Sequence, residues 1–271
     1  MLGFLSGGDS TVVSCLGFPC RHTGLKPDSL LTAYIPPVRL HPGQVLKRHS
    51  STLTRTACIL RVMRIESPLL SGINLRLEPL DRRHIGGLVS ASAPDPSLYQ
   101  WSPVPQGAAQ ATTYVDIGLS GRDAGTAVPF AIISQTDGAI IGSTRFWNIE
   151  RWSWPPGHER HGRHLPDACE IGYTWFTRSA IRTAANTEAK LLMLTHAFET
   201  WQVLRVCFHT DARNHRSRAA LERIGAKCEG ILRAHRMAAD FIPRDSVRYS
   251  IVAAEWPEVK QQLTDRLHHR P

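Results

Sequence analysis

The segment from residue 127 to residue 149 constrains the fold of this chain more than any other stretch. It reads AVPFAIIS, then a turn that contains Asp137 and Gly138, then AIIGSTRFWNI. Runs of β-branched and aromatic residues on both sides of an Asp-Gly pair are a strong signal for two antiparallel strands joined by a tight turn. The segment therefore predicts a β-hairpin, and any fold of this chain has to contain it.

Strand and helix patterns both occur along the chain from residue 73 onward. Apolar runs, the first of which alternates with polar residues, predict strands over 73–80, 168–177, 205–211, 228–236 and 246–254. Helical spacing predicts helices over 82–91, 108–121, 187–201 and 215–224. Asp81 is expected to cap the first helix, Gly121 to end the second and Gly225 to end the last. Because consecutive strands pair as hairpins, the pattern predicts a mixed α/β (α+β) fold and not a doubly wound one.

The first 70 residues lack a sustained helical or strand period and contain recurrent prolines. Residues 1–64 hold eight basic side chains against two acidic ones, which accounts for six of the chain's nine excess positive charges. We therefore expect a poorly ordered basic extension over 1–70, with Met63 as a candidate for the true translation start. The remaining chain divides into a domain over 71–262 and a C-terminal tail over 263–271. Because that domain is only mildly basic, nucleic acid is not an expected partner.

The sequence also argues against several other classes of protein. The six cysteines are scattered without a CxxC pair, so neither a disulfide framework nor a zinc site is indicated, and Cys169 and Cys207 are expected to be buried thiols. His158, His161 and His164 lie in a segment that proline and glycine make irregular, so no metal is expected there. No apolar run is long enough to cross a bilayer and the start lacks a secretory signal, so a cytoplasmic location without membrane association is the default.

The stretch RSAIRTAANTEAKLL, residues 178–192, joins a predicted strand to a predicted helix. A helix N-terminus has backbone amides without partners and carries the positive end of the helix dipole, which is why phosphate groups bind there. Asn186 is a plausible cap for this helix, and Arg178 and Arg182 add positive charge beside the loop. The loop contains no glycine, although its small side chains let a ligand approach the backbone. The junction is therefore either a phosphate site or a plain connection.

A second segment of this kind, TDARNHRSRAALERIGA over residues 210–226, follows the next predicted strand. Asn214 stands where it could cap the following helix, and Ser217 lies three residues later on the first turn. Leu221 and Ile224 belong to the inner face of that helix. Taken alone, the segment favours ordinary capping by Asn214 and a solvated Ser217 over a ligand site.

The order of these segments resembles that of the GNAT superfamily of acetyl-CoA-dependent N-acetyltransferases, and within it the RimJ/RimL group, which acetylates protein N-termini among other amines. The matching text is EIGYTWF (170–176), NTEAKLLMLTHAFE (186–199), VCFHTDARNHRSRAALERIGAKCEGILR (206–233) and RDSVRYSIVAAEWPEVK (244–260), with weaker similarity at LRLEPLDRRH (75–84). The resemblance covers about residues 73–262. It implies a mixed, mostly antiparallel central sheet flanked by helices, with acetyl-CoA as co-substrate, no metal, and an amine as the acceptor.

The resemblance also implies a set of cofactor-binding residues. In the family, the amides of a glycine-containing loop hold the cofactor's pyrophosphate, and the corresponding positions here are Thr177, Arg178, Arg182, Thr183, Ala184, Ala185 and Asn186. Asn214 matches an asparagine that contacts the pantetheine side of the cofactor. Many members have a general-acid tyrosine where this chain has Leu221. Ser217 matches the serine of the RimL-like branch instead, and is implied both to contact the cofactor and to donate a proton to the thiolate.

The reaction implied is direct attack of a neutral amine on the acetyl thioester, so a substrate ammonium must first lose a proton. Glu170, on the strand before the junction, is the candidate base, acting through water; an ion-paired strand residue is the alternative interpretation. A backbone amide of the strand over 169–177 is expected to stabilise the thioester oxygen. Because an N-terminal α-amine has a pKa of about 8, it needs less help from a base than a lysine does.

Three interpretations of the function follow from the resemblance. The first is acetyl transfer to a protein or peptide N-terminal α-amine, which a long open groove favours. The second is acetylation of a small amine such as an antibiotic or a polyamine, which an acidic acceptor pocket favours. The third is a catalytically silent module that binds acyl-CoA or a partner protein. Trp147, Trp152 and Trp154 either line an acceptor groove, are buried, or contact a partner subunit, and a homodimer is left open.

Overall fold

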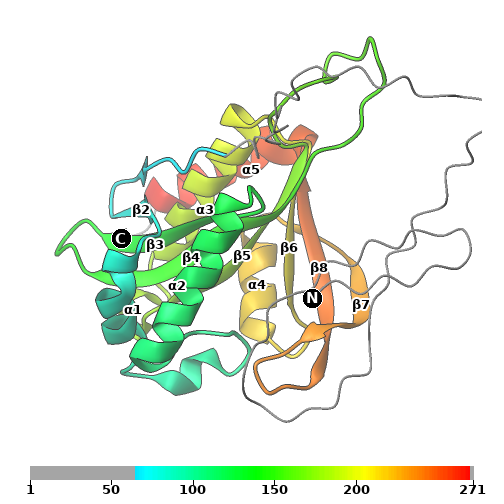
Figure 1. Ribbon diagram of the computed structural model, residues 1–271. Coiled ribbons are helices and arrows are strands. Elements are labelled where there is room, and N and C mark those ends of the chain that lie inside the picture. The colour runs from blue at the N-terminus through cyan, green and yellow to red at the C-terminus, as the bar shows by residue number, and fades with distance from the viewer. Residues whose placement is uncertain (1–64, 269–271) are drawn as a thin grey trace, which may run out of the picture. The chain divides into compact units, whose positions relative to one another are not determined.

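The computed structural model describes residues 65–268. Of the basic extension expected over 1–70, residues 1–64, with Met63, lie outside the described residues. The described part of the chain contains an eight-stranded sheet with helices on both faces (Figure 1). This arrangement confirms the predicted mixed α/β fold.

The sheet has the strand order β1-β2-β3-β4-β5-β6-β8-β7. The strands are β1 (Leu70–Ser71), β2 (Leu75–Pro79), β3 (Val128–Ser134), β4 (Ile140–Glu150), β5 (Ala168–Phe176), β6 (Arg205–Asp211), β7 (Lys227–Met237) and β8 (Pro243–Val252). Neighbouring strands are antiparallel except β5 and β6, which are parallel. The predicted hairpin is β3 and β4, and Gly138 in its turn has a φ of 72°. The sheet is therefore mostly antiparallel, as expected.

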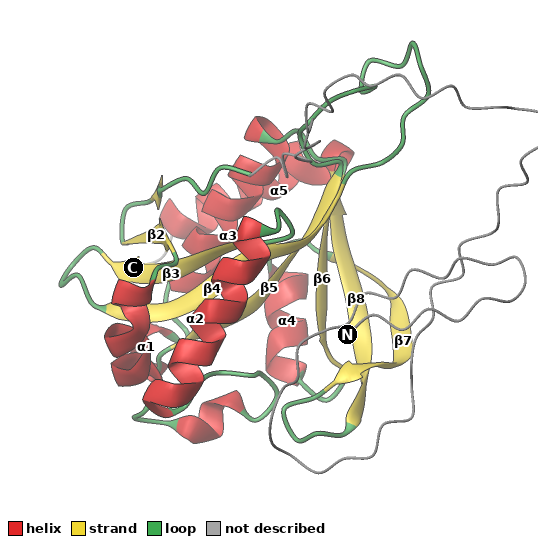
Figure 2. Cartoon of the chain, in the orientation of Figure 1, coloured by secondary structure: helices red, strands yellow, loops and turns green. Residues whose placement is uncertain are grey.

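Helices cover the two faces of the sheet (Figure 2). One face carries α1 (Ile85–Ser92) and α2 (Gly107–Asp123). The other face carries α3 (Ala185–Thr195), which continues as a π-helical turn (His196–Thr200), together with α4 (His215–Arg223) and α5 (Trp256–His268). The predicted helices are therefore confirmed in place, and the Asp81 side chain accepts a hydrogen bond from the Arg83 amide, as a cap does.

Two hydrophobic cores lie on the two faces of the sheet, and β3 contributes to both. Phe130 and Ile132 are buried on the side of α3, whereas Ala131 and Ile133 are buried on the side of α1 and α2. Because successive side chains of a strand point to opposite faces, a strand that is apolar at every position requires cover on both faces. The continuous apolar run of β3 therefore explains why helices pack on both sides.

The second predicted helix ends later than expected. α2 continues through Gly121 to Asp123, and the residue with positive φ after its end is Gly125, at 68°. A Cβ at position 121 would lie 3.0 Å from the Cβ of Ala127, so Gly121 permits close packing and does not end the helix. A left-handed residue just past the last turn commonly ends a helix, and Gly125 is the residue that takes this role.

The folded domain extends beyond both predicted limits. Residues 263–268, expected to form a tail, belong to α5, and Leu263 is fully buried in the same core as Trp256. At the other end, β1 pairs with β2, and Ile65 and Leu70 pack against the core. Apolar side chains that recur at helical spacing across residue 262 explain why the chain does not end its fold there.

Strands β5 and β6 separate after a short parallel pairing. They pair from Ala168 to Glu170 of β5 and from Arg205 to Cys207 of β6. Both strands continue beyond this pairing and diverge (Figure 1). The sheet is therefore open between their C-terminal halves, and α3 and α4 each follow one of these two strands.

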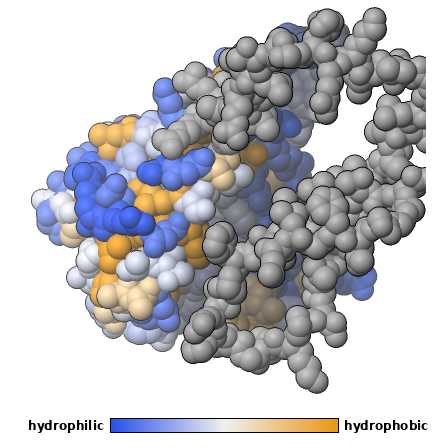
Figure 3. Space-filling model, in the orientation of Figure 1, coloured by the Kyte–Doolittle hydropathy of each residue, from blue (hydrophilic) through white to orange (hydrophobic). Residues whose placement is uncertain are grey.

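The surface around α1 and α2 mixes apolar patches with hydrophilic residues (Figure 3). Within residues 65–268, no helix is long and apolar enough to cross a membrane. The longest helix in this range, α2, has 17 residues, whereas a transmembrane helix needs about 20 predominantly apolar ones.

Candidate active site

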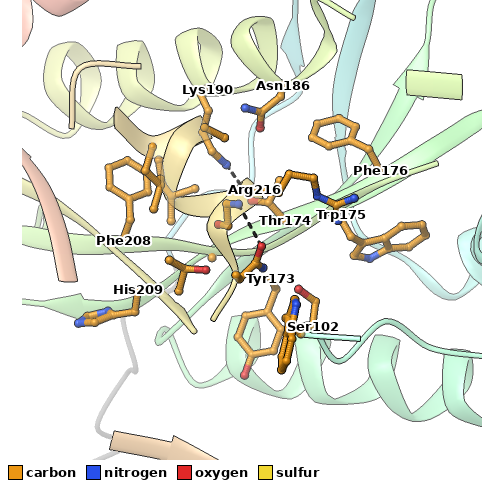
Figure 4. A pocket seen from close by; sticks show the side chains of 18 of the residues that line it. Ser102, Tyr173, Thr174, Trp175, Phe176, Asn186, Lys190, Phe208, His209 and Arg216 are labelled. Atoms are coloured by element: carbon orange, nitrogen blue, oxygen red, sulfur yellow. Dashed lines mark hydrogen bonds between the residues drawn. The ribbon is translucent and has the colours of Figure 1, made fainter. Parts of the chain in front are cut away.

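A pocket of about 500 Å³ occupies the opening between β5 and β6. One end, here called the helix end, is lined by Arg182, Thr183, Asn186, Asn214 and Ser217. A second part of the lining, here called the aromatic end, is formed by Tyr99, Trp101, Trp147 and Tyr173. In Figure 4, Lys190 and Asn186 reach toward the pocket from α3, and Tyr173 and Ser102 lie on its other side. The pocket thus joins two helix N-termini to an aromatic surface.

The loop before α3 leaves backbone amides free at the helix end. α3 begins at Ala185, and its N-cap residue, Ala184, offers no side-chain acceptor. Thr183 Oγ1 accepts a hydrogen bond from the Ala185 amide at 3.1 Å, but in the described part of the chain the amides of Asn186 and Thr187 have no acceptor. Free donors at the positive end of a helix dipole favour an anionic ligand.

Asn186 does not cap α3, contrary to the prediction. It is the second residue of the helix, so its side chain lines the pocket from the first turn (Figure 4). Arg182 has a φ of 66°, a left-handed conformation that glycine adopts with less strain. An arginine therefore occupies the left-handed position of this turn, where a glycine was expected.

The predicted loop residues separate into two groups. The pocket is lined by Arg182, Thr183 and Asn186 and is not lined by Thr177, Arg178, Ala184 or Ala185. Arg178 forms an ion pair with Asp95 instead, and Ala185 packs in the hydrophobic core. The structure therefore brings three of the seven loop residues together with Asn214 and Ser217.

The start of α4 forms the other wall of the helix end. Asn214 Oδ1 accepts a hydrogen bond from the Ser217 amide at 3.0 Å, which confirms Asn214 as the cap of this helix. Within residues 65–268, neither the Asn214 Nδ2 nor the Ser217 hydroxyl has a hydrogen-bond partner, and both residues line the pocket. Leu221, one turn further along, also lines the pocket and is buried. The wall therefore offers an amide and a hydroxyl without partners, and two arginines of α4, Arg216 and Arg223, also line the pocket.

Lys190 is a pocket residue that sequence reasoning missed. Its side chain is 4% exposed, and its Nζ donates a hydrogen bond to Thr174 Oγ1 at 2.8 Å (Figure 4). Burial lowers the pKa of this amine to about 7. Lys190 follows Asn186 by four residues, so both side chains lie on one face of α3. This spacing is present in the sequence and could have predicted that Lys190 lies near the ligand loop.

A β-bulge in β5 lies at the middle of the pocket. The register against β4 shifts between the pairs Ser143–Trp175 and Arg145–Gly172, and Tyr173 has a φ of 54°. The extra residues of a bulge are left out of the hydrogen-bond ladder. The strand over 169–177 therefore offers unpaired backbone at the pocket, as the expected amide site for a thioester oxygen requires.

Glu170 lines the pocket but is also ion-paired. Its side chain is nearly buried, and its carboxylate accepts hydrogen bonds from Arg236 Nη2 at 3.1 Å and from Asn148 Nδ2 at 3.0 Å. His209 Nδ1 lies 3.0 Å from the same carboxylate. Burial acts to raise the pKa of Glu170, but the hydrogen bonds from His209 and Arg236 outweigh it and lower the pKa. Glu170 is therefore an ionised group inside the pocket.

The aromatic end contains one of the three tryptophans considered from the sequence. The Trp147 ring meets the Tyr173 ring edge-on at 5.1 Å, and the Arg236 guanidinium lies 4.2 Å from the Trp147 ring centre. Trp152 and Trp154 do not line the pocket; their indole nitrogens donate to Glu150 and Asp167. Trp147 therefore belongs to the site, and the other two tryptophans stabilise the neighbouring loop.

The histidine-rich segment is irregular, as predicted. His158 stacks on Trp154, with ring centres 4.2 Å apart, and His161 Nδ1 lies 2.8 Å from the Trp154 carbonyl. Among the residues that the structure describes, no group of three His, Cys, Asp or Glu is arranged to hold a metal. Cys169 and Cys207 are buried free thiols, as expected.

Comparison with known proteins shows the family of this chain. The family model described as an acetyltransferase (GNAT) domain matches residues 74–227, more than half of the chain. A GCN5-related N-acetyltransferase from Brucella melitensis is 26% identical, with 74% of this chain and 86% of that chain covered and a TM-score of 0.64. Mycobacterium smegmatis RimJ, solved with CoA-disulfide, is 22% identical, with 73% and 91% covered and a TM-score of 0.58.

RimL, a ribosomal L7/L12 α-N-protein acetyltransferase, is 18% identical, with 68% of this chain and 94% of that chain covered and a TM-score of 0.57. No curated protein matches the chain. The fold, the open sheet and the family match together define an acyltransferase, and the chain belongs to the GNAT acetyltransferase family. It is therefore an enzyme that depends on acetyl-CoA and acts on an amine acceptor.

The residues present at the helix end fit such a cofactor. A phosphate-bearing ligand needs donors and positive charge, and this end offers the free amides of Asn186 and Thr187 beside Arg182. The unpartnered Asn214 Nδ2 and Ser217 hydroxyl lie further along the pocket wall. The absence of glycine therefore does not remove the donor set.

Proposed function

We propose that this protein is a RimJ/RimL-type acetyltransferase whose acceptor is the N-terminal α-amine of a protein or peptide. The charge of the pocket carries this proposal. Among the described residues that line the pocket, Glu170 is the only one with a carboxylate, and that carboxylate is paired with Arg236. Polyamines and aminoglycosides carry several positive charges, and a pocket without free carboxylates disfavours them, since like charges repel at an interface.

The relatives on this fold give the proposed acceptor class a precedent. RimL is an α-N-protein acetyltransferase of ribosomal L7/L12, although its 18% identity to this chain supports the fold alone. The aromatic end is also extensive enough to contact more than the amine itself, since four aromatic side chains line it. A peptide backbone next to the amine has a surface that such side chains can cover.

The helix end is assigned to the cofactor, which supplies the acetyl thioester when bound. The amides of Asn186 and Thr187, with Arg182, would hold its pyrophosphate, because these donors have no other acceptor in the described chain. Asn214 would donate its Nδ2 to the pantetheine arm. Four of the loop residues expected to bind the cofactor do not line the pocket and are assigned only to supporting the loop: Thr177, Arg178, Ala184 and Ala185.

The centre of the pocket is assigned to charge stabilisation and proton transfer. The unpaired backbone at the Tyr173 bulge would donate to the thioester oxygen, where negative charge develops. The Ser217 hydroxyl, free of other partners in residues 65–268, would donate to the departing sulfur, because Leu221 has no proton to give.

Glu170 is assigned to the acceptor side, as the group that takes the amine's proton through a water molecule. Arg236 and His209 keep it ionised, so it is a weak base. An α-amine with a pKa of about 8 is partly neutral at physiological pH, so a weak base beside it is sufficient. The lowered pKa thus fits an α-amine better than the more basic amine of a lysine side chain.

An acceptor panel tests the proposal. The full chain would be incubated with acetyl-CoA and one of four acceptors: a peptide with a free N-terminus, the same peptide formylated at its N-terminus but with an internal lysine, spermidine, or an aminoglycoside. Mass spectrometry would locate the acetyl group. We expect acetylation at the free α-amine alone. Acetylation of spermidine or the aminoglycoside in preference to the peptide would replace the proposed acceptor class with the small-amine class.

A further inference from the structure

Arg244, at the start of β8, is a positive charge without a counter-ion in the pocket. Its side chain is half-buried, its Nε is fully buried without a hydrogen-bond partner, and it makes no ion pair within residues 65–268. Burial lowers the pKa of this guanidinium, more than the nearby carboxylates of Asp211 and Glu170 raise it. A buried charge of this kind is costly unless a partner compensates for it.

The carboxylates near Arg244 are already occupied by other arginines. Glu170 is paired with Arg236 at 3.1 Å, and Asp211 is paired with Arg213 at 2.8 Å. Because both carboxylates are paired with other arginines, Arg244 has no carboxylate partner among the described residues. Three further arginines line the pocket without an ion pair in the described residues: Arg182, Arg216 and Arg223. Among the described pocket-lining arginines, only Arg244 has a fully buried Nε without a hydrogen-bond partner.

The position of Arg244 in the sheet adds to this excess. Arg236 of β7 and Arg244 of β8 are paired residues in the antiparallel register, so their side chains leave the sheet on the same face. Like charges directly opposite one another on neighbouring strands are destabilising. Glu170 neutralises one of the two arginines, and an anion bound from solution would neutralise the other.

Arg244 stands beside Arg236, on the side of the pocket that is assigned above to the acceptor. Arg236 lies over the Trp147 ring, and Trp147 pairs with Glu170 across β4 and β5. Arg244 leaves the sheet on the same face as Arg236, its partner in the β7–β8 register, and Arg236 is paired with Glu170. Trp147 belongs to the aromatic end, whereas the free amides proposed for the pyrophosphate lie at the start of α3.

We propose that Arg244 binds a carboxylate of the acceptor, so that the preferred substrate is an amine that carries a carboxylate close by. The inference rests on the proposed function and narrows its substrate class. A guanidinium matches a carboxylate geometrically, since two parallel N–H groups can donate to its two oxygens. Among peptides, the matching acceptors have aspartate or glutamate next to the N-terminal residue. Among small molecules, the same chemistry belongs to free amino acids.

Matched pairs of acceptors test this inference. One pair is a peptide with aspartate at its second position and the same peptide with asparagine there; another is free glutamate and its diamide. The full chain and its Arg244→Gln and Arg233→Gln variants would be compared. Arg233 is an exposed arginine of the neighbouring strand β7, outside the described pocket, so its variant controls for loss of one positive charge.

Two readouts keep the inference separate from the proposed function. The first is kcat/KM for each acceptor, and the second is calorimetric binding of the acceptors without cofactor, which does not depend on turnover. We expect the wild type and Arg233→Gln to prefer the aspartate peptide over the asparagine peptide by roughly 10- to 100-fold in both readouts, and Arg244→Gln to lose that preference. A circular-dichroism melt of each variant checks that it is folded.

Equal binding and equal kcat/KM for the two peptides in the wild type would overturn the inference and leave N-terminal acetylation standing. Preference for glutamate over its diamide, with no peptide acetylated, would support the carboxylate site and overturn the peptide acceptor. A preference for aspartate that Arg244→Gln retains would show that another group binds the carboxylate, and would also overturn the inference.

Discussion

The Nζ of Lys190 on α3 donates a hydrogen bond to the Oγ1 of Thr174 on β5 at 2.8 Å. This contact crosses the floor of the pocket and joins the helix that is proposed to hold the pyrophosphate to the strand that carries the bulge. No carboxylate in the described residues pairs with Lys190, and burial lowers the pKa of its amine to about 7. The charge of the pocket therefore changes within the physiological pH range.

Substituting Lys190 with methionine should change how stability depends on pH. The folded-state pKa of about 7 lies below the unfolded value of about 10.4, so between these pH values the unfolded state binds a proton that the folded state does not. Wild-type stability therefore gains roughly 1 kcal/mol per pH unit from this residue as the pH rises through that window. The stabilising effect of Lys190→Met should be largest at or below pH 7 and fade toward pH 10.

Urea unfolding of the wild type and of Lys190→Met at pH 7, 8 and 9 would measure this difference. Lys227→Met is the matched control, because Lys227 is exposed and its ion pair with Glu255 raises its pKa, so its charge is constant over that window. A difference between Lys190→Met and the wild type that is the same at pH 7 and pH 9 would show that Lys190 stays charged in the folded protein.

Replacing Asn214 with aspartate should separate its capping role from its ligand role. Aspartate keeps a side-chain oxygen for the Ser217 amide and adds a favourable charge at a helix N-terminus, so stability should be kept or slightly raised. It loses the Nδ2 donor, so the affinity for acetyl-CoA should fall by roughly 10-fold. Calorimetry with acetyl-CoA and a thermal melt would be compared, and unchanged affinity would limit Asn214 to capping.

Ser217→Ala should lower kcat without a loss of stability. Its hydroxyl has no partner in residues 65–268, so its removal leaves no buried group unsatisfied. If the hydroxyl assists departure of the thiolate, kcat should fall by roughly 100-fold while the KM for acetyl-CoA changes little. Ser90→Ala, on an exposed position of α1, is the control. Undiminished kcat in Ser217→Ala would show that the Ser217 hydroxyl does not donate a proton to the departing thiolate.

Glu170→Gln should lower both activity and stability, for different reasons. The amide cannot accept the substrate proton, and Arg236 loses its counter-ion in a mostly buried site. Because the folded pKa of Glu170 is lowered, its contribution to stability is present above the unfolded pKa and is lost as the pH falls through the folded pKa. The stability difference between variant and wild type should therefore shrink under acid conditions.

The double variant Glu170→Gln/Arg236→Gln distinguishes the two effects. Removing both charges should restore much of the thermal stability but leave kcat/KM reduced by roughly 100-fold at pH 7. Profiles of kcat/KM from pH 6 to 9 would be measured for all three enzymes. Full kcat/KM in the double variant across this range would make Glu170 an ion-paired strand residue without a part in proton transfer.

The fold could be predicted because its elements carry local signals. The hairpin formed by β3 and β4 shows in its turn and in its β-branched runs, and the cap of α4 shows in Asn214. The predicted end of α2 at Gly121 was wrong, because only packing against Ala127 shows that the helix passes through Gly121 and ends before Gly125. The α5 helix continues past residue 262 because Leu263 is buried in the hydrophobic core. This burial depends on tertiary packing and not on a local sequence signal.

The candidate site could be predicted only in part. Asn214, Ser217 and Glu170 follow from their places on strands and helix starts, and the structure brings them to one pocket. The sequence contained a signal for the position of Lys190, on the Asn186 face of its helix, but not for its burial. Arg244 was missed because an arginine looks alike in a sequence whether solvent or protein surrounds it. Their significance comes from burial without a counter-ion, which depends on which strands and helices meet.

The central claim is that the glycine-free start of α3 binds the pyrophosphate of acetyl-CoA, and titration calorimetry of the full chain tests it most directly. Asn186→Asp is the variant of choice, because a negative charge in the first turn of a helix stabilises the helix but repels phosphate. Ala185→Asp is less suitable, since Ala185 packs in the core. We predict micromolar binding by the wild type and at least a 10-fold loss in Asn186→Asp with an unchanged or higher melting temperature. Equal affinity in the two proteins, or no binding by the wild type, would contradict the account.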